Sequence, residues 1–481
     1  MKFNKVQIRI FLPAFIKTIY IWIKNFSMKK IFLLFSVFLL GCTCSFSQAS
    51  FNVPLEEPSP GDTVKKDNTP EEKKCEQGAI GDLFRKKDKP PKPPKKFLAL
   101  VLPNISSNPT NGFLLGVGGS FGWYMGPREN TKVSSAPFTL AVTSKSQLLF
   151  FIKHNIFSKG NTYFLQGDWK FYIYSQPTYG LGTNSPDTMG LPSTISWLGE
   201  GNPNDSIIFP MKYNFIKFHE IVNRQIIGEL YGGVGYHLDY FYSIDDEYYS
   251  PEVPAIPATD STPYIPPVPE KQTPHSYYCN RDGFSRLGYT VSGLSANFIY
   301  DTRDNQINPY KGMYANINYR INTTFLGSSQ NSSTLWLEYR TYVGLQKKNP
   351  RHLIGFWAFG DFTITGKLPY LTIPYLGEDQ RARSGRGYTN GRYRGEHIVY
   401  GEVEYRFPIW PCTNIIGGVV FVNATTASNK ARDVALFEYI KPGVGFGLRI
   451  MVNKYFRTNI NIDYAFGMKS SGFYFSGQET F

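Results

Sequence analysis

The residue types that could carry chemistry gather in one stretch, RSGRGYTNGRYRGEHIVYGEVEYRFPI, which runs from Arg383 to Ile409. It begins as a loop rich in glycine and arginine. It continues as an expected strand in which Glu402, Glu404 and Arg406 alternate with apolar residues. Successive side chains of a strand point to opposite faces, so the charged groups share one face. This strand must therefore separate an apolar environment from a polar one beside a basic loop.

No other motif predicts an enzyme. GGSFG at Gly118 to Gly122 matches the G-x-S-x-G pattern of serine hydrolases, but that pattern needs a strand–turn–helix context with histidine and acid partners. Here it lies inside an alternating strand, so Ser120 is interpreted as a strand residue. The six histidines are scattered without metal-ligand spacing. We expect no catalytic residue, no metal and no cofactor.

The composition favours a β-rich protein. The 481 residues are 42% hydrophobic and 16% aromatic, and 44 of them are glycine, which suits many strands and turns. The mean hydropathy of −0.28 does not resemble that of a helical membrane protein. The formal charge is +14, and residues 1–47 hold seven basic and no acidic residues, so the remainder carries 44 − 37 = +7. This modest charge gives little support to nucleic-acid binding.

The N-terminal residues predict export. Met28 is followed by two lysines and the apolar run IFLLFSVFLLG, which is typical of a secretory signal peptide and too short for a transmembrane helix. We expect translation to start at Met28 and cleavage to follow Ser47, with residues 1–47 forming an upstream extension and signal. LLGC also fits a lipoprotein signal, in which Cys42 would be acylated.

Residues 48–96 are polar and rich in proline and lysine, which predicts a flexible periplasmic segment. Its basic end could instead contact anionic lipid headgroups. Beyond the signal, Cys75, Cys279 and Cys412 are odd in number and far apart, so no disulfide framework is expected. The Pro-rich stretch 250–271 is interpreted as a mobile surface loop, with a recognition segment as the alternative.

From residue 97 to residue 481 the dominant period is two. In YANINYRIN the even-numbered residues are polar and the odd-numbered ones apolar, and TNINIDYAF repeats this with Asn459, Asn461 and Asp463 on the polar face. Sixteen strands are expected, near 97–105, 112–124, 135–144, 147–157, 161–175, 211–226, 228–243, 287–303, 313–325, 331–345, 352–365, 397–410, 415–426, 443–452, 458–466 and 472–481.

Three features favour a transmembrane antiparallel β-barrel of about 16 strands over a soluble sandwich, which would also alternate. The strands are about ten residues long, which suffices to cross a bilayer at a tilt. Many apolar faces end in aromatic residues, and short connections alternate with long ones, as in outer-membrane barrels. Because hydrocarbon tolerates no unpaired backbone, we expect the sheet to close. Cys279 and Cys412 then fall on opposite sides of the membrane.

Three stretches resemble the outer-membrane assembly-factor superfamily of BamA and TamA, the bacterial surface antigen family. YDTRDNQINPYKGMY resembles its strand–turn–strand signature through Asp301, Arg303, Asp304, Pro309 and Gly312. RGYTNGRYRG followed by EYRFPI resembles its sixth outer loop and the next strand. GVGFGLRI, NINIDYAFG and GFYFSGQETF resemble its last three strands, which end in an aromatic residue, here Phe481.

In that family the sixth loop folds into the lumen, where its arginine is held by groups of the inner wall. The resemblance places Arg386, followed by Gly387 and Tyr388, in that role. Glu404 is the expected partner, and Glu402 and Asp463 are the alternatives. A guanidinium can bind a carboxylate through two charge-assisted hydrogen bonds. Otherwise Arg386 lies among solvated loop charges.

The chain departs from the family pattern in three places. FVNAT carries Asn423 and Thr425 where relatives often place an aspartate, so the anchor could shift to strand 397–410. The segment from Gly477 to Phe481 is one residue longer than the common terminal signal. The 49 residues before the barrel are too few for the POTRA domains of BamA and TamA, so we expect a member without them.

Two functions remain. The resemblance implies outer-membrane biogenesis, in which the barrel inserts or translocates proteins or lipids. The alternative is a pore-forming or structural surface barrel without an assembly role. Either way the chain is expected in the outer membrane of a Gram-negative bacterium, spanning it many times. Its expected partners are outer-membrane lipid and lipopolysaccharide, together with other outer-membrane proteins as clients or subunits.

Overall fold

The computed structural model describes residues 78–83, 96–108, 112–144, 146–184, 209–258, 264–346, 349–377, 379, 383–410, 413–477 and 479–481. All of them belong to one compact unit, Lys73–Phe481. The expected signal and extension of residues 1–47, and with them Cys42, lie outside the described residues, as do Cys75 and Cys412.

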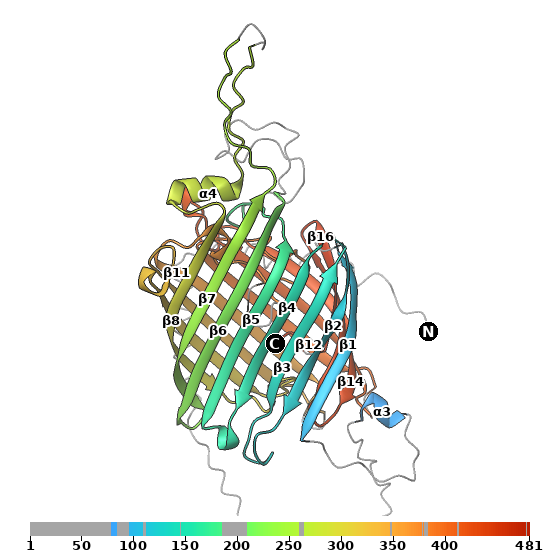
Figure 1. The fold of residues 1–481 in the computed structure, drawn as a ribbon. Helices are drawn as coiled ribbons and strands as arrows, with labels where there is room; N and C mark the ends of the chain where they lie inside the picture. Colours follow the sequence, from blue (N-terminus) through green and yellow to red (C-terminus); the bar gives the residue numbers. More distant parts are fainter. Residues whose placement is uncertain are drawn as a thin grey trace, which may run out of the picture. The chain divides into compact units, whose positions relative to one another are not determined.

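Sixteen antiparallel strands form one sheet whose order follows the chain from β1 to β16 (Figure 1). The strands are β1(Phe97–Asn108), β2(Gly112–Trp123), β3(Ser134–Thr143), β4(Leu148–Phe157), β5(Tyr163–Ser175), β6(Met211–Ile227), β7(Leu230–Asp246), β8(Gly288–Asp301), β9(Gly312–Asn322), β10(Ser332–Gly344), β11(Leu353–Gly366), β12(His397–Pro408), β13(Ile416–Ala427), β14(Lys441–Asn453), β15(Thr458–Gly467) and β16(Ser470–Ser476). The predicted number of strands is confirmed, and the first fifteen begin and end within three residues of their predicted limits.

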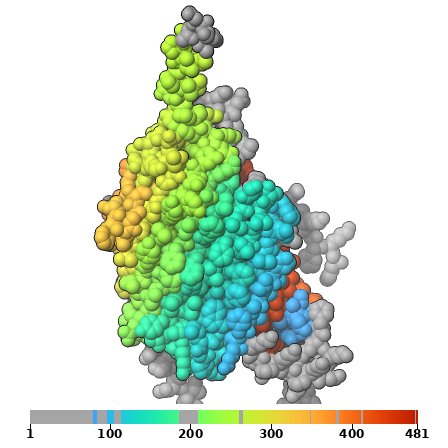
Figure 2. All heavy atoms as spheres, in the orientation of Figure 1, coloured from blue at the N-terminus to red at the C-terminus, as the bar shows by residue number. Residues whose placement is uncertain are grey.

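The polar and apolar residues that alternate along each strand point to the inner and outer faces of the barrel, respectively. On β12, Glu402, Glu404 and Arg406 are buried, whereas Val403 between them is exposed. Exposed apolar side chains recur along the outer faces of the other strands, among them Val142, Val222, Phe298, Ile317, Phe356, Val422 and Phe446. Figure 2 shows this outer face as a continuous wall over β2 to β8. An apolar outside around a polar inside is the arrangement of a transmembrane β-barrel.

The expected closure of the sheet is wrong for the described residues. β1 and β16 are the two ends of the strand order, and no ladder joins them. β16 has only seven residues instead of the predicted ten, because the chain leaves the wall after Ser476. There it passes β1, where a side chain added at Gly477 would lie 3.5 Å from Leu100. Glu479, Thr480 and Phe481 are then buried at 1%, 2% and 0% exposure.

The long connections carry structure that the sequence interpretation missed. The β7–β8 connection contains the helix α4(Pro274–Asp282), which starts at a capping box formed by Thr273 and Ser276 and ends at Gly283 in the left-handed conformation. The hydroxyl of Tyr278 donates to the carbonyl of Leu368, at 2.9 Å. This bond joins α4 to the β11–β12 connection. It lies at the end of the barrel where β7 and β11 terminate and are followed by long loops (Figure 1).

The remaining helical turns are short. They are α3(Ile80–Leu83), η1(Lys159–Asn161), η3(Thr324–Leu326), η4(Tyr370–Thr372) and η5(Lys430–Arg432). Within the described ranges, no helix has the length and hydrophobicity that crossing a membrane requires.

Part of the expected flexible segment 48–96 is docked. The amide of Gly78 donates to the carbonyl of Thr413 in the β12–β13 turn, at 2.7 Å. Asp82 of α3 lies 3.4 Å from the ammonium of Lys454 in the β14–β15 turn. Residues 78–83 of that segment therefore have polar partners at the barrel end.

Residues 250–258 and 264–271 of the Pro-rich stretch form two paired arms that project from the barrel (Figure 1). Three residue pairs, Ser250–Lys271, Val253–Val268 and Ile256–Ile265, bridge the two arms. Successive pairs are three residues apart along each arm, whereas a β-strand repeats every two. Three residues is the period of polyproline II. Pro251, Pro254, Pro266, Pro267 and Pro269 lie between the pairs and have no amide hydrogen to donate to the ladder.

Candidate functional site

The connection between β11 and β12, residues 367–396, is called loop six here. Its described residues, 367–377, 379 and 383–396, fold back into the barrel. Its side chains are buried where they meet the inner wall: Arg386 is 2% exposed, Tyr388 8% and Tyr393 none. A solvated loop is excluded for this segment. Gly385 and Gly387 adopt φ angles of +77° and +101°, which brings the backbone around Arg386 into a compact turn.

Arg386 binds all three of the predicted carboxylates. One terminal nitrogen, Nη1, donates to Oδ2 of Asp463 at 2.8 Å. The other, Nη2, donates to Oε1 of Glu402 at 2.5 Å and also to Oε1 of Glu404. Burial alone would lower the pKa of Arg386, but the three carboxylates more than offset it and raise the pKa well above that of free arginine. The guanidinium therefore stays charged at every physiological pH.

The residues beside the guanidinium account for the departure from the family pattern. The guanidinium carbon of Arg386 lies 3.3 Å from the ring centre of Phe421 on β13, a cation–π contact. Two residues along β13, the side chain of Asn423 donates to the carbonyl of Arg386 at 3.1 Å. β13 thus contacts the loop backbone through Asn423 and the guanidinium through the ring of Phe421, while β12 and β15 supply the negative charge. The expected shift of the anchor to β12 is observed, and β15 shares it.

Gly387 and Tyr388 fix the loop against the last strands. A side chain at Gly387 would come within 2.7 Å of the backbone of Phe466, so only glycine fits there. The Gly387 amide donates to the hydroxyl of Tyr474 on β16 at 2.9 Å. The hydroxyl of Tyr388 donates to the carbonyl of Pro442 at 2.5 Å and accepts from the amide of Met468 at 3.1 Å. The three predicted loop residues therefore act at one place.

Three residues that the sequence interpretation left out extend this cluster. Arg449 on β14 pairs with Asp463 and donates through Nε to Oε2 of Glu479 at 2.7 Å. Arg406 on β12 donates through Nε to Oε2 of Glu404, also at 2.7 Å. The inward positions of Arg406 and Arg449 could be found from strand parity. No pattern places Glu479 there, because it follows the last strand.

The segment after β16, residues 477–481, is the lumenal tail. Oε1 of Glu479 accepts from the side chain of Asn459 at 2.6 Å, and the main-chain oxygen of Phe481 accepts from Nη2 of Arg406 at 3.0 Å. The ring of Phe481 lies 5.4 Å from that of Trp357 and 6.1 Å from that of Tyr342. The prediction that Phe481 ends the last strand is wrong, because these aromatic and charged partners hold it inside the barrel.

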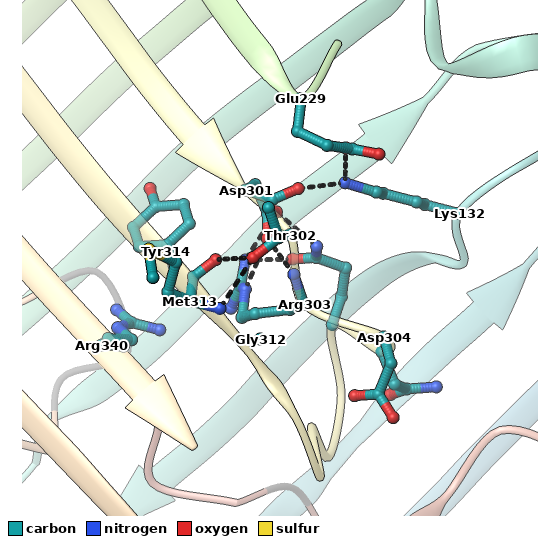
Figure 3. A network of polar contacts seen from close by, with 12 residues as sticks. Lys132, Glu229, Asp301, Thr302, Arg303, Asp304, Gly312, Met313, Tyr314 and Arg340 are labelled. Atoms are coloured by element: carbon teal, nitrogen blue, oxygen red, sulfur yellow. Dashed lines mark hydrogen bonds and ion pairs between the residues drawn. The ribbon is translucent and has the colours of Figure 1, made fainter. Parts of the chain in front are cut away.

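The strand–turn signature forms a second polar cluster (Figure 3). Asp301 at the end of β8 pairs with Arg303 at 2.9 Å, and both are buried. Asp304 accepts the amide of Tyr310 at 3.0 Å and so shapes the turn that contains Pro309. Gly312, with a φ of +97°, faces the carbonyl of Thr302 where a side chain could not fit. Lys132 reaches in from the β2–β3 connection to Glu229 and to the carbonyl of Asp301.

Replacing Asp301 with asparagine is expected to lower the free energy of unfolding by about 3–5 kcal/mol, because it leaves the buried Arg303 without its counter-charge. Urea titration of the protein in detergent micelles measures this change. Asp304→Asn is the matched control: Asp304 pairs with the partly exposed Arg457, so a loss below about 1 kcal/mol is expected. Equal losses in the two variants would show that the Asp301–Arg303 pair has no special weight.

The carboxylates of the loop-six cluster all bind arginines. What the cluster can do is hold two movable segments, loop six and the lumenal tail, through shared partners. Asp463 binds both Arg386 and Arg449, and Arg449 binds Glu479. Arg383 of loop six also donates to the main-chain oxygen of Glu479 at 3.0 Å, so release of either segment removes a partner from the other.

Comparison with known proteins yields one family. Residues 270–481 match the Omp85 superfamily domain. This range includes loop six, the strand–turn signature and the lumenal tail. No curated protein sequence matches the chain. Similar solved structures include BamA from Haemophilus ducreyi lacking POTRA domains 1–3, at 12% identity and a TM-score of 0.45, covering 81% of this chain and 69% of that one.

Two further similar structures are of CdiB. The protein from Acinetobacter baumannii is 14% identical with a TM-score of 0.42, covering 79% of this chain and 59% of that one. The protein from Escherichia coli is 8% identical with a TM-score of 0.44, covering 81% and 62%. This chain thus spans less than two thirds of either CdiB structure. Residues 270–481 of this chain are therefore identified as an Omp85 superfamily domain.

Proposed function

We propose that this barrel inserts or translocates proteins at the outer membrane by opening its wall between β1 and β16. The observation that carries the proposal is the missing ladder between these two strands. β1 has twelve residues and β16 only seven, so even full pairing would leave part of the β1 edge free. A free strand edge can pair with an incoming strand through main-chain hydrogen bonds.

The lumenal tail regulates this opening in our proposal. While Glu479 and Phe481 are bound inside, β16 cannot lengthen along β1. The clients are outer-membrane proteins, and the surrounding partners are outer-membrane lipid and lipopolysaccharide. The chemistry is non-covalent throughout, because strand exchange needs no catalytic residue.

Cross-linking across the seam tests this function. Cysteines introduced at Leu100 and Gly477, in a chain whose native cysteines are replaced, can be joined by a short bismaleimide with a reducible bond. In vesicles, the uncoupled protein is expected to raise the folding rate of a urea-denatured outer-membrane protein by about tenfold, a barrier change of about 1.4 kcal/mol. Cross-linking should abolish the increase and reduction should restore it. Folding that proceeds equally with the seam cross-linked would contradict the proposal.

A pore is the second candidate, and a lumenal cavity of about 210 Å³ favours it. Polar residues of β5 to β9 line this cavity, including Asp168, Lys217, His219, Asp239 and Arg320. Leu371 and Tyr375 of loop six also line it, so loop six narrows the passage. A plain pore would conduct ions steadily whatever the state of loop six. An assembly barrel would be closed until the loop is released.

A further inference from the structure

The outer wall carries one ionisable pair within its apolar band. On β6 the outward side chains between Asn214 and Arg224 are Ile216, Phe218, Glu220 and Val222. At a rise of about 3.3 Å per residue and a tilt of about 40°, the ten residue steps from Asn214 to Arg224 span about 25 Å, the height of a barrel's apolar band. Glu220 lies four residues from Arg224, so it sits about 10 Å inside the band.

Such a position is unusual within this barrel. On the outer faces of the described strands, Lys212, Arg224, Asp245 and His397 are ionisable, and each lies within three residues of a strand end. Glu220 and its neighbour His154 on β4 are well inside their strands. Because an ionised side chain in hydrocarbon is costly, such residues mark functional sites and need a partner.

The neighbouring strands build a cluster around Glu220. Its Oε2 atom lies 3.1 Å from Nε2 of His154 and accepts from Nε1 of Trp169 on β5, also at 3.1 Å. In register, His154 faces Gly167 and Gly167 faces Glu220. A side chain at Gly167 would come within 2.1 Å of His154 Nε2, so only glycine lets the ring reach across β5. The pair is therefore built into three strands.

The cluster has an open side. The contacts from His154 and Trp169 both go to Oε2 of Glu220, and Oε1 has no hydrogen bond among the described residues. The side chain of Glu220 is 24% exposed. Nδ1 of His154 is buried without a partner. The indole of Trp169 stacks on the ring of Phe218, with 5.4 Å between the ring centres. Aromatic rings therefore lie beside the carboxylate of Glu220. A free carboxylate oxygen next to aromatic faces is the environment that an ammonium or guanidinium group prefers.

We propose that the outward cluster of His154, Trp169 and Glu220 is a docking site for a membrane-embedded protein segment that presents a lysine or arginine in mid-bilayer. The two buried charges would stabilise each other in a medium that disfavours either alone. A second copy of this chain does not fit, because the described part of its outer wall has no lysine or arginine within the band. A lipid headgroup does not fit either, because it lies about 10 Å away at the interface.

The partner chemistry is tested with synthetic transmembrane helices. The full-length barrel is placed in phosphatidylcholine vesicles, and binding of a fluorescent polyleucine helix with one central lysine is compared with that of an all-leucine helix. The lysine helix is expected to bind at least about tenfold more tightly, and Glu220→Gln should remove the difference. Asp245→Asn is the matched control, because Asp245 is an outward carboxylate at the strand end, and it should change nothing.

Three outcomes would overturn the proposal. Equal binding of the two helices to the unaltered barrel would do so without any variant, so the test does not depend on the folding of Glu220→Gln. Dimers of the barrel that require Glu220 would identify a second copy as the occupant. Loss of the lysine preference when phosphatidylethanolamine is added would identify a lipid amine.

The depth of Glu220 is tested separately by carboxyl labelling. Dicyclohexylcarbodiimide partitions into hydrocarbon, whereas the charged carbodiimide EDC stays in water. Mass spectrometry is expected to find Glu220 labelled at least about tenfold more by the first reagent than by the second, and Asp245 more by the second, as their positions in the band require. Labelling of Glu220 by EDC at the level of Asp245 would place the cluster in water and contradict the docking site.

Discussion

Replacing Arg386 with alanine is expected to convert a mostly closed barrel into one that opens often. The change leaves Glu402, Glu404 and Asp463 buried around an empty space, and breaking a buried ion pair in this way costs about 3–5 kcal/mol. Since about 1.4 kcal/mol corresponds to a factor of ten, the released state of loop six should gain population by about a hundredfold or more. Single-channel recording in a planar bilayer measures the resulting openings.

Arg392→Ala is the matched control, because it removes the same charge from the same loop. The guanidinium of Arg392 stacks on the rings of Tyr179 and Tyr393. Its loss should change the open probability by less than about tenfold, since exposed or stacked cations contribute about 1 kcal/mol. Arg386→Lys keeps the charge but lacks the planar fork, so an intermediate effect is expected. A large, steady conductance in the unaltered protein that Arg386→Ala leaves the same would favour the plain pore.

The wall of the barrel could be predicted because one physical rule repeats along it. Hydrocarbon outside and water inside impose the same period of two on every strand, so TNINIDYAF and EVEYRFPI state both their structure and their direction. The same parity placed Glu402, Glu404 and Asp463 on the inner face and so produced the correct set of partners for Arg386. That all three would bind Arg386 at once could not be predicted, because it depends on where loop six enters the lumen.

The rest depends on contacts between segments that are distant in sequence. The lumenal tail turns inward because it contacts Arg449, Asn459 and Trp357, which lie on three different strands. The sequence GQET contains no local pattern that predicts these contacts. In contrast, α4 had a local signal that could have been used. Thr273 followed by proline, with Ser276 three residues on and Gly283 beyond the end, is the start and stop of a short helix.

The second large effect is expected from Glu479→Gln, which should release the lumenal tail. The substitution keeps the shape of the side chain but removes a negative charge that Arg449 and Arg406 hold in a buried site. Burial would raise the pKa of Glu479, yet these arginines lower it to about 2. A carboxyl whose pKa is lowered by folding stabilises the docked tail above its ordinary pKa. In the unaltered protein this contribution is therefore lost as the pH falls toward 2.

The labelling rate of a cysteine at Thr480, which is 2% exposed, reports the position of the tail. We expect a membrane-impermeant maleimide to label it at least about tenfold faster in Glu479→Gln, since losing one partner of a buried pair costs about 3–5 kcal/mol. Glu229→Gln, which breaks a pair with a half-exposed carboxylate, should leave the rate unchanged. If the rate stays low in a folded Glu479→Gln variant but rises in Phe481→Ala, then the ring of Phe481 and not the charge of Glu479 holds the tail, and the two movable segments are not coupled through Arg449.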